Sequence, residues 1–214
     1  MNNIEQKVLL PGDQRYTIAT PTGYTGDKPV PLVLALHFAG HGTPFYGRII
    51  LEELVEPALR ALEALIVAPD CTAETWSDPH SEADVLTLLD YLSNNYAVDA
   101  ERVLITGYSM GGNGTWYMAA RHADRFSAAV VVSGWPSPEV EGVDWKVPIY
   151  VIHSRQDEFV PLEATQYAVN SLAEQGAEIK LVVLDGITHF ETYRFIEPLH
   201  SVVPWVEGLW QDKV

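Results

Sequence analysis

The feature that most constrains this chain is the stretch at residues 100–120, AERVLITGYSMGGNGTWYMAA. It opens with a short apolar run at residues 103–106, turns through a glycine-flanked serine at residues 107–111, and continues with helical periodicity to about residue 122. A strand, a tight turn and a helix in immediate succession predict a sheet whose helices connect parallel strands.

The serine in that turn, Ser109, is the candidate reactive group. Side chains two residues before and after it would collide with neighbouring backbone, so Gly107 and Gly111 leave the space that such a turn needs. The amide of Met110 begins the helix without an intrahelical acceptor and can point at a developing oxyanion. The alternative is a glycine-rich turn with an idle serine, and other parts of the chain must decide between the two.

Composition narrows the class of protein and its partners. The 214 residues are 47% hydrophobic and 20% charged, as in an ordinary globular protein. A formal net charge of −16 disfavours nucleic acid and anionic membranes as partners. The one cysteine, Cys71, excludes an intramolecular disulfide. The chain has no signal-peptide pattern and no apolar run near the roughly 20 residues of a membrane span. A cytoplasmic protein is therefore expected, of undetermined oligomeric state.

Apolar runs and helical periodicity alternate along the whole length. Strands are expected at residues 7–10, 15–20, 31–36, 65–68, 103–106, 128–133, 147–152 and 179–184. Helices are expected at residues 49–62, 81–96, 110–122, 162–175 and 190–210, the last one broken near Pro198 or Pro204. This pattern predicts a single α/β domain over residues 1–214, with an antiparallel hairpin first and then a mostly parallel sheet with helices on both faces.

Polar residues follow several of the expected strands. Ser109, Asp157 and His189 each come after a strand, and so does the loop at residues 37–42. Ligand chemistry in an open α/β sheet gathers at the carboxyl ends of the strands. A serine hydroxyl needs a base to take its proton, and a histidine base needs a carboxylate to orient it and stabilise its cation. We therefore expect these three side chains to act together.

Three motifs in this order carry a resemblance. They are GYSMGG at residues 107–112, HSRQDEFVP at residues 153–161 and GITH at residues 186–189. The chain resembles the α/β-hydrolase superfamily, in particular its small carboxylesterase/phospholipase and dienelactone-hydrolase-like serine esterases. The resemblance implies that Ser109 is the nucleophile, His189 the general base and Asp157 its orienting partner. It also implies a carboxylic ester hydrolase that forms an acyl-serine intermediate, uses no metal or cofactor, and takes a small-molecule ester as its partner.

The resemblance leaves the second oxyanion donor open. Met110 supplies the first donor, and relatives usually read H-G-x-G in the loop that supplies the second. This chain reads His37-Phe38-Ala39-Gly40, so Ala39 is the expected donor by position and Phe38 the alternative. Phe38 is also expected to wall the substrate pocket, and Tyr108 and Trp135 to contribute to it.

Other residues are candidates for some of these roles or for metal binding. Asp185 and Glu158 are alternative acids, although Asp185 directly ends a strand. The spacing of four histidines does not suggest a zinc site: His37, His41, His80 and His153. His37 and His153 are instead expected to make structural hydrogen bonds beside the site. Cys71 is expected to be inert, and His200 and Trp210 to be packing residues.

The short connection between the expected strands at residues 128–133 and 147–152 also bears on function. Only about a dozen residues lie between Gly134 and Val147, which leaves no room for a cap domain. An open, shallow site suits small or protruding esters. Thioesterase, lysophospholipase or small-peptidase activity are the enzymatic alternatives, and a catalytically silent ligand-binding protein is the non-enzymatic one.

Overall fold

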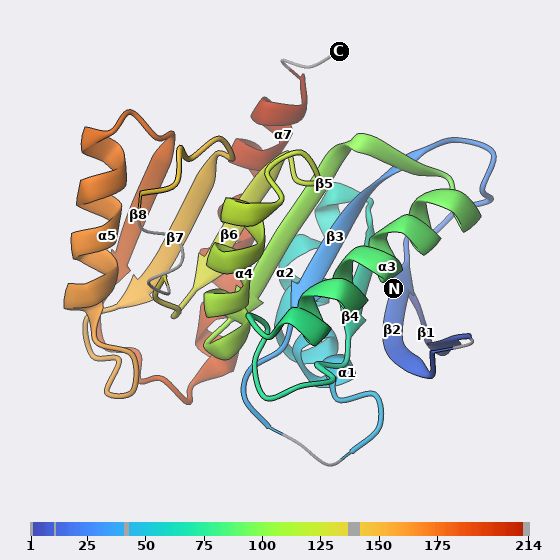
Figure 1. Ribbon diagram of the computed structural model, residues 1–214, viewed down its shortest axis with the longest axis horizontal. Coiled ribbons are helices and arrows are strands. Elements are labelled where there is room, and N and C mark those ends of the chain that lie inside the picture. The colour runs from blue at the N-terminus through green and yellow to red at the C-terminus, as the bar shows by residue number, and fades with distance from the viewer. Residues whose placement is uncertain (1, 11, 41–42, 137–141, 212–214) are drawn as a thin grey trace.

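The computed structural model describes residues 2–10, 12–40, 43–136 and 142–211. An eight-stranded sheet runs through them in the order β1-β2-β4-β3-β5-β6-β7-β8 (Figure 1). The strands are β1 (Asn3–Leu9), β2 (Gln14–Thr20), β3 (Val30–Leu36), β4 (Leu65–Pro69), β5 (Val98–Tyr108), β6 (Ala128–Val132), β7 (Ile149–Ser154) and β8 (Ile179–Leu184). The expected hairpin is formed by β1 and β2, with Leu9 opposite Gln14.

The direction of the strands decides where their ends meet. β2 pairs antiparallel with both β1 and β4, whereas every neighbouring pair from β4 to β8 is parallel. The carboxyl ends of β3, β5, β6, β7 and β8 therefore lie along one edge. The expected mostly parallel sheet is confirmed, and the loops that carry the candidate residues all leave from that edge.

Helices cover both faces of this sheet (Figure 1). One face carries α3 (Pro79–Asn95), α4 (Met110–Arg121) and α5 (Leu162–Glu174). The other carries α1 (Gly47–Ile50), η1 (Leu51–Val55), α2 (Glu56–Leu59), η2 (Arg60–Leu62), η4 (Thr192–Phe195), α6 (Ile196–His200) and α7 (Val203–Gln211). Successive strand residues point to opposite faces. In β3, for example, Leu32 and Leu34 pack in the core on the side of α3, α4 and α5, whereas Val33 and Ala35 pack in the core on the opposite side.

Two expected helices are interrupted, and prolines account for both. The helix expected at residues 49–62 begins at Gly47, widens into a π-helical segment at Leu51–Val55, and ends in a 3₁₀ turn. Pro57 lacks an N–H and its ring crowds the preceding turn, which a wider turn relieves. The closing helix is split between α6 and α7, and Pro204 lies in the first turn of α7, where no N–H is needed.

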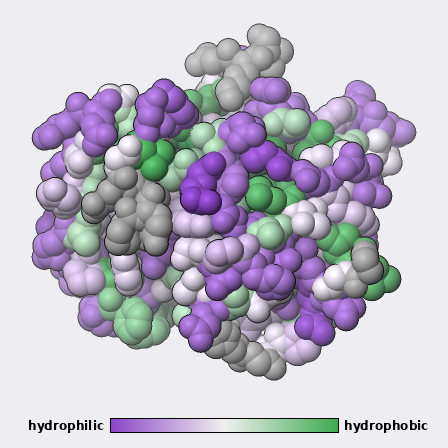
Figure 2. Space-filling model, in the orientation of Figure 1, coloured by the Kyte–Doolittle hydropathy of each residue, from purple (hydrophilic) through white to green (hydrophobic). Residues whose placement is uncertain are grey.

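One face of the molecule is mostly hydrophilic. In the view of Figure 2, which looks onto α3, α4 and α5, hydrophilic residues predominate and the apolar ones form small separate areas. No helix among the described ranges combines the length and the hydrophobicity that crossing a bilayer requires. Between β6 and β7, the described residues contain neither helix nor strand. Residues 137–141 of the expected cap-less connection lie outside the described residues.

Candidate active site

The turn between β5 and α4 is strained in the way that the sequence predicts. Ser109 has φ 57° and ψ −120°, which a residue with a side chain rarely adopts. A Cβ on Gly107 would lie 2.2 Å from the carbonyl oxygen of Gly111, and one on Gly111 would lie 1.9 Å from that of Leu36. Both glycines are thus required by close backbone contacts, as expected. The turn brings the end of β3 directly against the start of α4.

A chain of hydrogen bonds links the three expected side chains. His189 Nε2 lies 2.9 Å from Ser109 Oγ, and His189 Nδ1 lies 2.9 Å from each carboxylate oxygen of Asp157. All three residues are buried, with exposed fractions of 8%, 3% and 7% for the serine, the histidine and the aspartate. Because Nδ1–H donates to the carboxylate, Nε2 is free to accept the serine proton. The structure therefore brings the three expected side chains into one continuous chain of hydrogen bonds, and their catalytic roles stay predictions.

Asp157 is held as a carboxylate by its surroundings. Its Oδ1 accepts hydrogen bonds from the amides of Val160 at 2.7 Å and Phe159 at 3.1 Å. Burial pushes the pKa of Asp157 upward, but the hydrogen bonds from His189 and these amides outweigh it, so the pKa lies below its ordinary value. An ionised acid is what the histidine needs when it takes up a proton.

The two alternative acids occupy other positions. Asp185 is exposed and pairs with Arg155 at 3.1 Å. Glu158 accepts the backbone N–H of His189 at 2.9 Å and does not hydrogen-bond the ring. Asp157 is thus the carboxylate that faces the imidazole, and Glu158 anchors the loop that carries it.

Two further buried residues lie around the pair formed by His189 and Asp157. Tyr108, only 3% exposed, stacks on the His189 ring with centroids 5.3 Å apart. His153 is fully buried, and its Nε2 lies 2.8 Å from the carbonyl oxygen of Val160. Burial lowers the pKa of His153, which keeps it neutral near the acid. The structural role expected for His153 is confirmed, whereas substrate contact by Tyr108 stays a prediction, because its ring lies behind His189.

His37 fixes the loop after β3. The Cys71 N–H donates to His37 Nε2 at 2.9 Å, so the neutral ring carries its proton on Nδ1, which donates to the Phe38 carbonyl at 2.6 Å. In a trans peptide the C=O and the following N–H point in opposite directions. The Ala39 N–H is therefore turned away from His37, an orientation compatible with the expected oxyanion donor. That role, like the role of Met110, stays a prediction.

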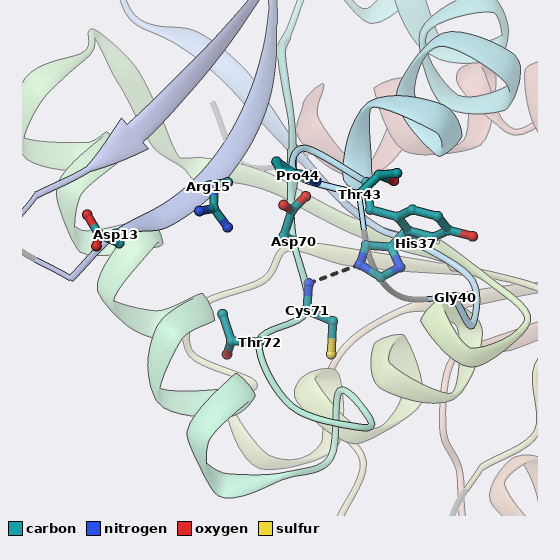
Figure 3. Close-up of a pocket in the computed structure, with 10 residues that line it drawn as sticks. Asp13, Arg15, His37, Gly40, Thr43, Pro44, Asp70, Cys71 and Thr72 are labelled. Atoms are coloured by element: carbon teal, nitrogen blue, oxygen red, sulfur yellow. Dashed lines mark hydrogen bonds between the residues drawn. The ribbon is translucent and has the colours of Figure 1, made fainter.

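A cavity of about 370 Å³ lies beside this loop (Figure 3). Its lining includes His37 and Gly40 from the loop, together with Arg15, Asp70 and Cys71. The Asp70 carboxylate is already used, because it accepts the amides of Phe45 at 2.7 Å and Gly47 at 3.0 Å. None of Ser109, Asp157 and His189 lines this cavity.

The other predicted residues are distributed as follows. Phe38 is half-buried, with its ring 6.1 Å from that of Tyr108. Trp135 is 36% exposed just after β6, and its backbone N–H donates to Asn113 Oδ1 at 3.0 Å. Burial raises the pKa of the Cys71 thiol, as expected for an inert cysteine. In the described ranges no group of three or more histidine, cysteine or acidic residues is arranged to hold a metal ion, and His41 lies outside them.

The packing role expected for Trp210 is confirmed, whereas His200 is exposed and contributes one hydrogen bond. Trp210 is 5% exposed and donates its indole N–H to Ser127 Oγ at 2.9 Å. His200 Nδ1 lies 2.9 Å from the carbonyl oxygen of Ala58. Both therefore tie the closing helices to the core.

Sequence reasoning missed two exposed rings beside the histidine. Phe159 is 63% exposed and Phe190 is 74% exposed, and each contacts the His189 ring, with centroids 5.2 and 5.3 Å away. The sequence feature that could have indicated them is that each phenylalanine lies in the same loop as Asp157 or His189.

The sheet order and the serine turn at its carboxyl edge define the protein as an α/β-hydrolase. It is similar to the crystal structure of a thermostable esterase (TM-score 0.72, 24% identity, covering 98% of this chain and 62% of that one). It is also similar to a ferulic acid esterase from Anaeromyces mucronatus (TM-score 0.71, 14% identity, covering 98% and 92%). At these identities the similarity shows the fold.

The family model of the dienelactone hydrolase family matches residues 68–194, more than half of the chain. The chain belongs to the dienelactone hydrolase family. A probable feruloyl esterase C of Aspergillus flavus is 26% identical over 175 residues, which cover 76% of this chain and 64% of the relative. The chain thus spans less than two thirds of the length of that curated relative.

Proposed function

We propose that this protein hydrolyses carboxylic esters through an acyl-serine intermediate. The observation that carries the proposal is the continuous hydrogen-bonded chain from Ser109 Oγ through His189 to Asp157, each link 2.9 Å long. The strained backbone of Ser109 adds support, because such strain persists where the surrounding structure over-determines it and is concentrated at functional sites.

In the proposed reaction, Ser109 Oγ attacks the ester carbonyl while His189 Nε2 takes its proton. Asp157 stabilises the imidazolium, and the amides of Met110 and Ala39 stabilise the tetrahedral oxyanion. His189 then returns the proton to the departing alcohol, which leaves an acyl-serine. A water activated by His189 releases the acid and restores the serine. The step needs no metal or cofactor.

The substrate class comes from the relatives. Several curated relatives are named feruloyl esterases, including that of Aspergillus flavus and feruloyl esterase D of Neurospora crassa. We therefore place small esters of hydroxycinnamic acids among the substrates. The cytoplasmic location of the protein and its organisation as a single domain over residues 1–214 also remain predictions.

Intact-mass labelling with a fluorophosphonate probe tests the proposal. Wild type is expected to gain one adduct and Ser109→Ala none, because only an activated serine reacts. Ser201→Ala, which removes an exposed hydroxyl far along the chain, serves as the matched control and should label like wild type. Absence of an adduct on folded wild type would favour the silent ligand-binding alternative. Methyl ferulate, methyl butyrate and a matched thioester then separate the candidate substrates.

A further inference from the structure

Two exposed phenylalanines form a continuous ledge beside the proposed catalytic histidine. Phe159 and Phe190 contact each other with centroids 6.0 Å apart, and both contact His189. Large apolar side chains that gather at an exposed site mark binding surfaces. Here 63% and 74% of the two side chains remain exposed.

The ledge is fixed in place by the same hydrogen bonds that orient the site. The Phe159 N–H donates to Asp157 Oδ1 at 3.1 Å. Phe190 follows His189, whose own N–H donates to Glu158 Oε2 at 2.9 Å. Because both backbones are anchored, the rings present a preformed surface, and a ligand that binds there would pay little ordering entropy.

The position of the ledge selects one half of an ester. During hydrolysis the leaving oxygen must come within hydrogen-bond distance of His189 Nε2 to receive its proton. Buried Tyr108 stacks on the histidine from the protein interior, while Phe159 and Phe190 border it on the solvent side. The alcohol half of the substrate, which is attached to the leaving oxygen, thus has the ledge as its neighbouring surface.

The chemistry of the ledge selects the kind of alcohol. Aromatic rings attract flat apolar groups through burial and through offset or edge-to-face contacts. The exposed carboxylate of Glu158, between Asp157 and Phe159 in the chain, disfavours an anionic group. We infer that Phe159 and Phe190 form the leaving-group subsite and that it takes neutral aryl or arylmethyl alcohols. This inference rests on the proposed ester hydrolysis and adds an alcohol-side preference to it.

Two constitutional isomers test the subsite directly. Benzyl acetate carries its ring on the alcohol half, and methyl phenylacetate carries the same ring on the acyl half. Phe159→Ala and Phe190→Ala are each expected to lower kcat/KM for benzyl acetate on the order of tenfold, and to change it less than twofold for methyl phenylacetate. Phe159→Leu, which keeps apolar bulk but removes the ring, should give an intermediate loss.

Controls separate the subsite from the proposed function. Tyr167→Ala removes an aromatic side chain that is 75% exposed on α5 and should affect neither isomer. Equal losses on both isomers would overturn the inference, because they would mean that the rings only position His189. If wild type labels with fluorophosphonate but hydrolyses neither isomer, the inferred subsite would also be overturned, while the reactivity of Ser109 would be established. Failure of wild type to label would refute the ester hydrolysis itself, and the subsite with it.

Discussion

Asp157 and Glu82 are both mostly buried carboxylates that hydrogen-bond a histidine, yet their surroundings differ. Glu82 Oε1 accepts from Arg121 Nε at 2.8 Å and lies 2.6 Å from His122 Nε2, while its Oε2 accepts from the Tyr117 hydroxyl at 3.0 Å. Arginine already neutralises this carboxylate, and the cluster joins the first turn of α3 to the end of α4. Its geometry fits a structural clamp.

Asp157 has neutral amides where Glu82 has an arginine. Its hydrogen bonds come from His189 and from the amides of Phe159 and Val160. The negative charge of Asp157 can therefore stabilise a positive charge on the His189 ring. The other nitrogen of that ring faces Ser109. A histidine–carboxylate pair is thus suited to proton transfer when no other cation neutralises the carboxylate and the second ring nitrogen faces a nucleophile.

The largest effect is expected for Asp157→Asn. An amide in place of the carboxylate would favour the wrong tautomer of His189, so kcat/KM should fall by about 10⁴-fold. Ester hydrolysis by purified variant and wild type measures this, with circular dichroism to verify folding. A loss below tenfold would place the orienting acid elsewhere.

Gly111→Ala tests the close approach on which the serine turn depends. The new Cβ would lie 1.9 Å from the Leu36 carbonyl oxygen, so the backbone must shift, at a cost on the order of 3 kcal/mol in unfolding free energy. Activity should fall as well. Gly208→Ala is the control: its Cβ meets nothing within 4 Å in α7, and it should stabilise by about 0.5–1 kcal/mol. Urea denaturation compares them, and equal stability of the two variants would contradict the clash.

Glu82→Gln should distinguish the structural role of Glu82 from the proposed catalytic role of Asp157, because it should affect stability and not activity. Removing the charge from the clamp leaves Arg121 without its ion-pair partner and His122 with a weaker hydrogen-bond partner, and should lower the unfolding free energy by about 2 kcal/mol. Because the clamp does not reach Ser109, kcat/KM should change less than twofold. Denaturation and ester hydrolysis of the same preparation provide both values. A large loss of activity at unchanged stability would show that the two regions are coupled.

The smallest effect concerns pH and His153. Its pKa is lowered in the folded protein, so below the ordinary histidine pKa of about 6.5 the unfolded chain binds a proton that the folded protein does not. Stability from this group is complete above that pH and falls as pH decreases. Between pH 7 and pH 5.5 wild type should lose more unfolding free energy than His153→Gln does, as urea denaturation at the two pH values measures. Parallel stability curves for the two proteins would refute this assignment.

Much of the site could be predicted from the sequence because it lies in short motifs at strand ends. Gly107, Ser109 and Gly111 define a local backbone turn, and a local turn follows from nearby residues. Asp157 and His189 could be found because the carboxyl ends of parallel strands share one edge. The break in the closing helix was predicted only approximately, because Pro198 and Pro204 were both candidates and the structure places the break beside Pro204.

The alternation of strands and helices, the serine turn and the order of the three candidate residues all follow from local patterns in the sequence. Contacts in the folded chain were needed to show how the His37 hydrogen bond to the Phe38 carbonyl turns the Ala39 amide, and that Phe159 lies exposed beside the site. The physical reason is that backbone periodicity is a local property. The direction of a loop side chain is set by contacts with residues distant in sequence, which local patterns do not encode.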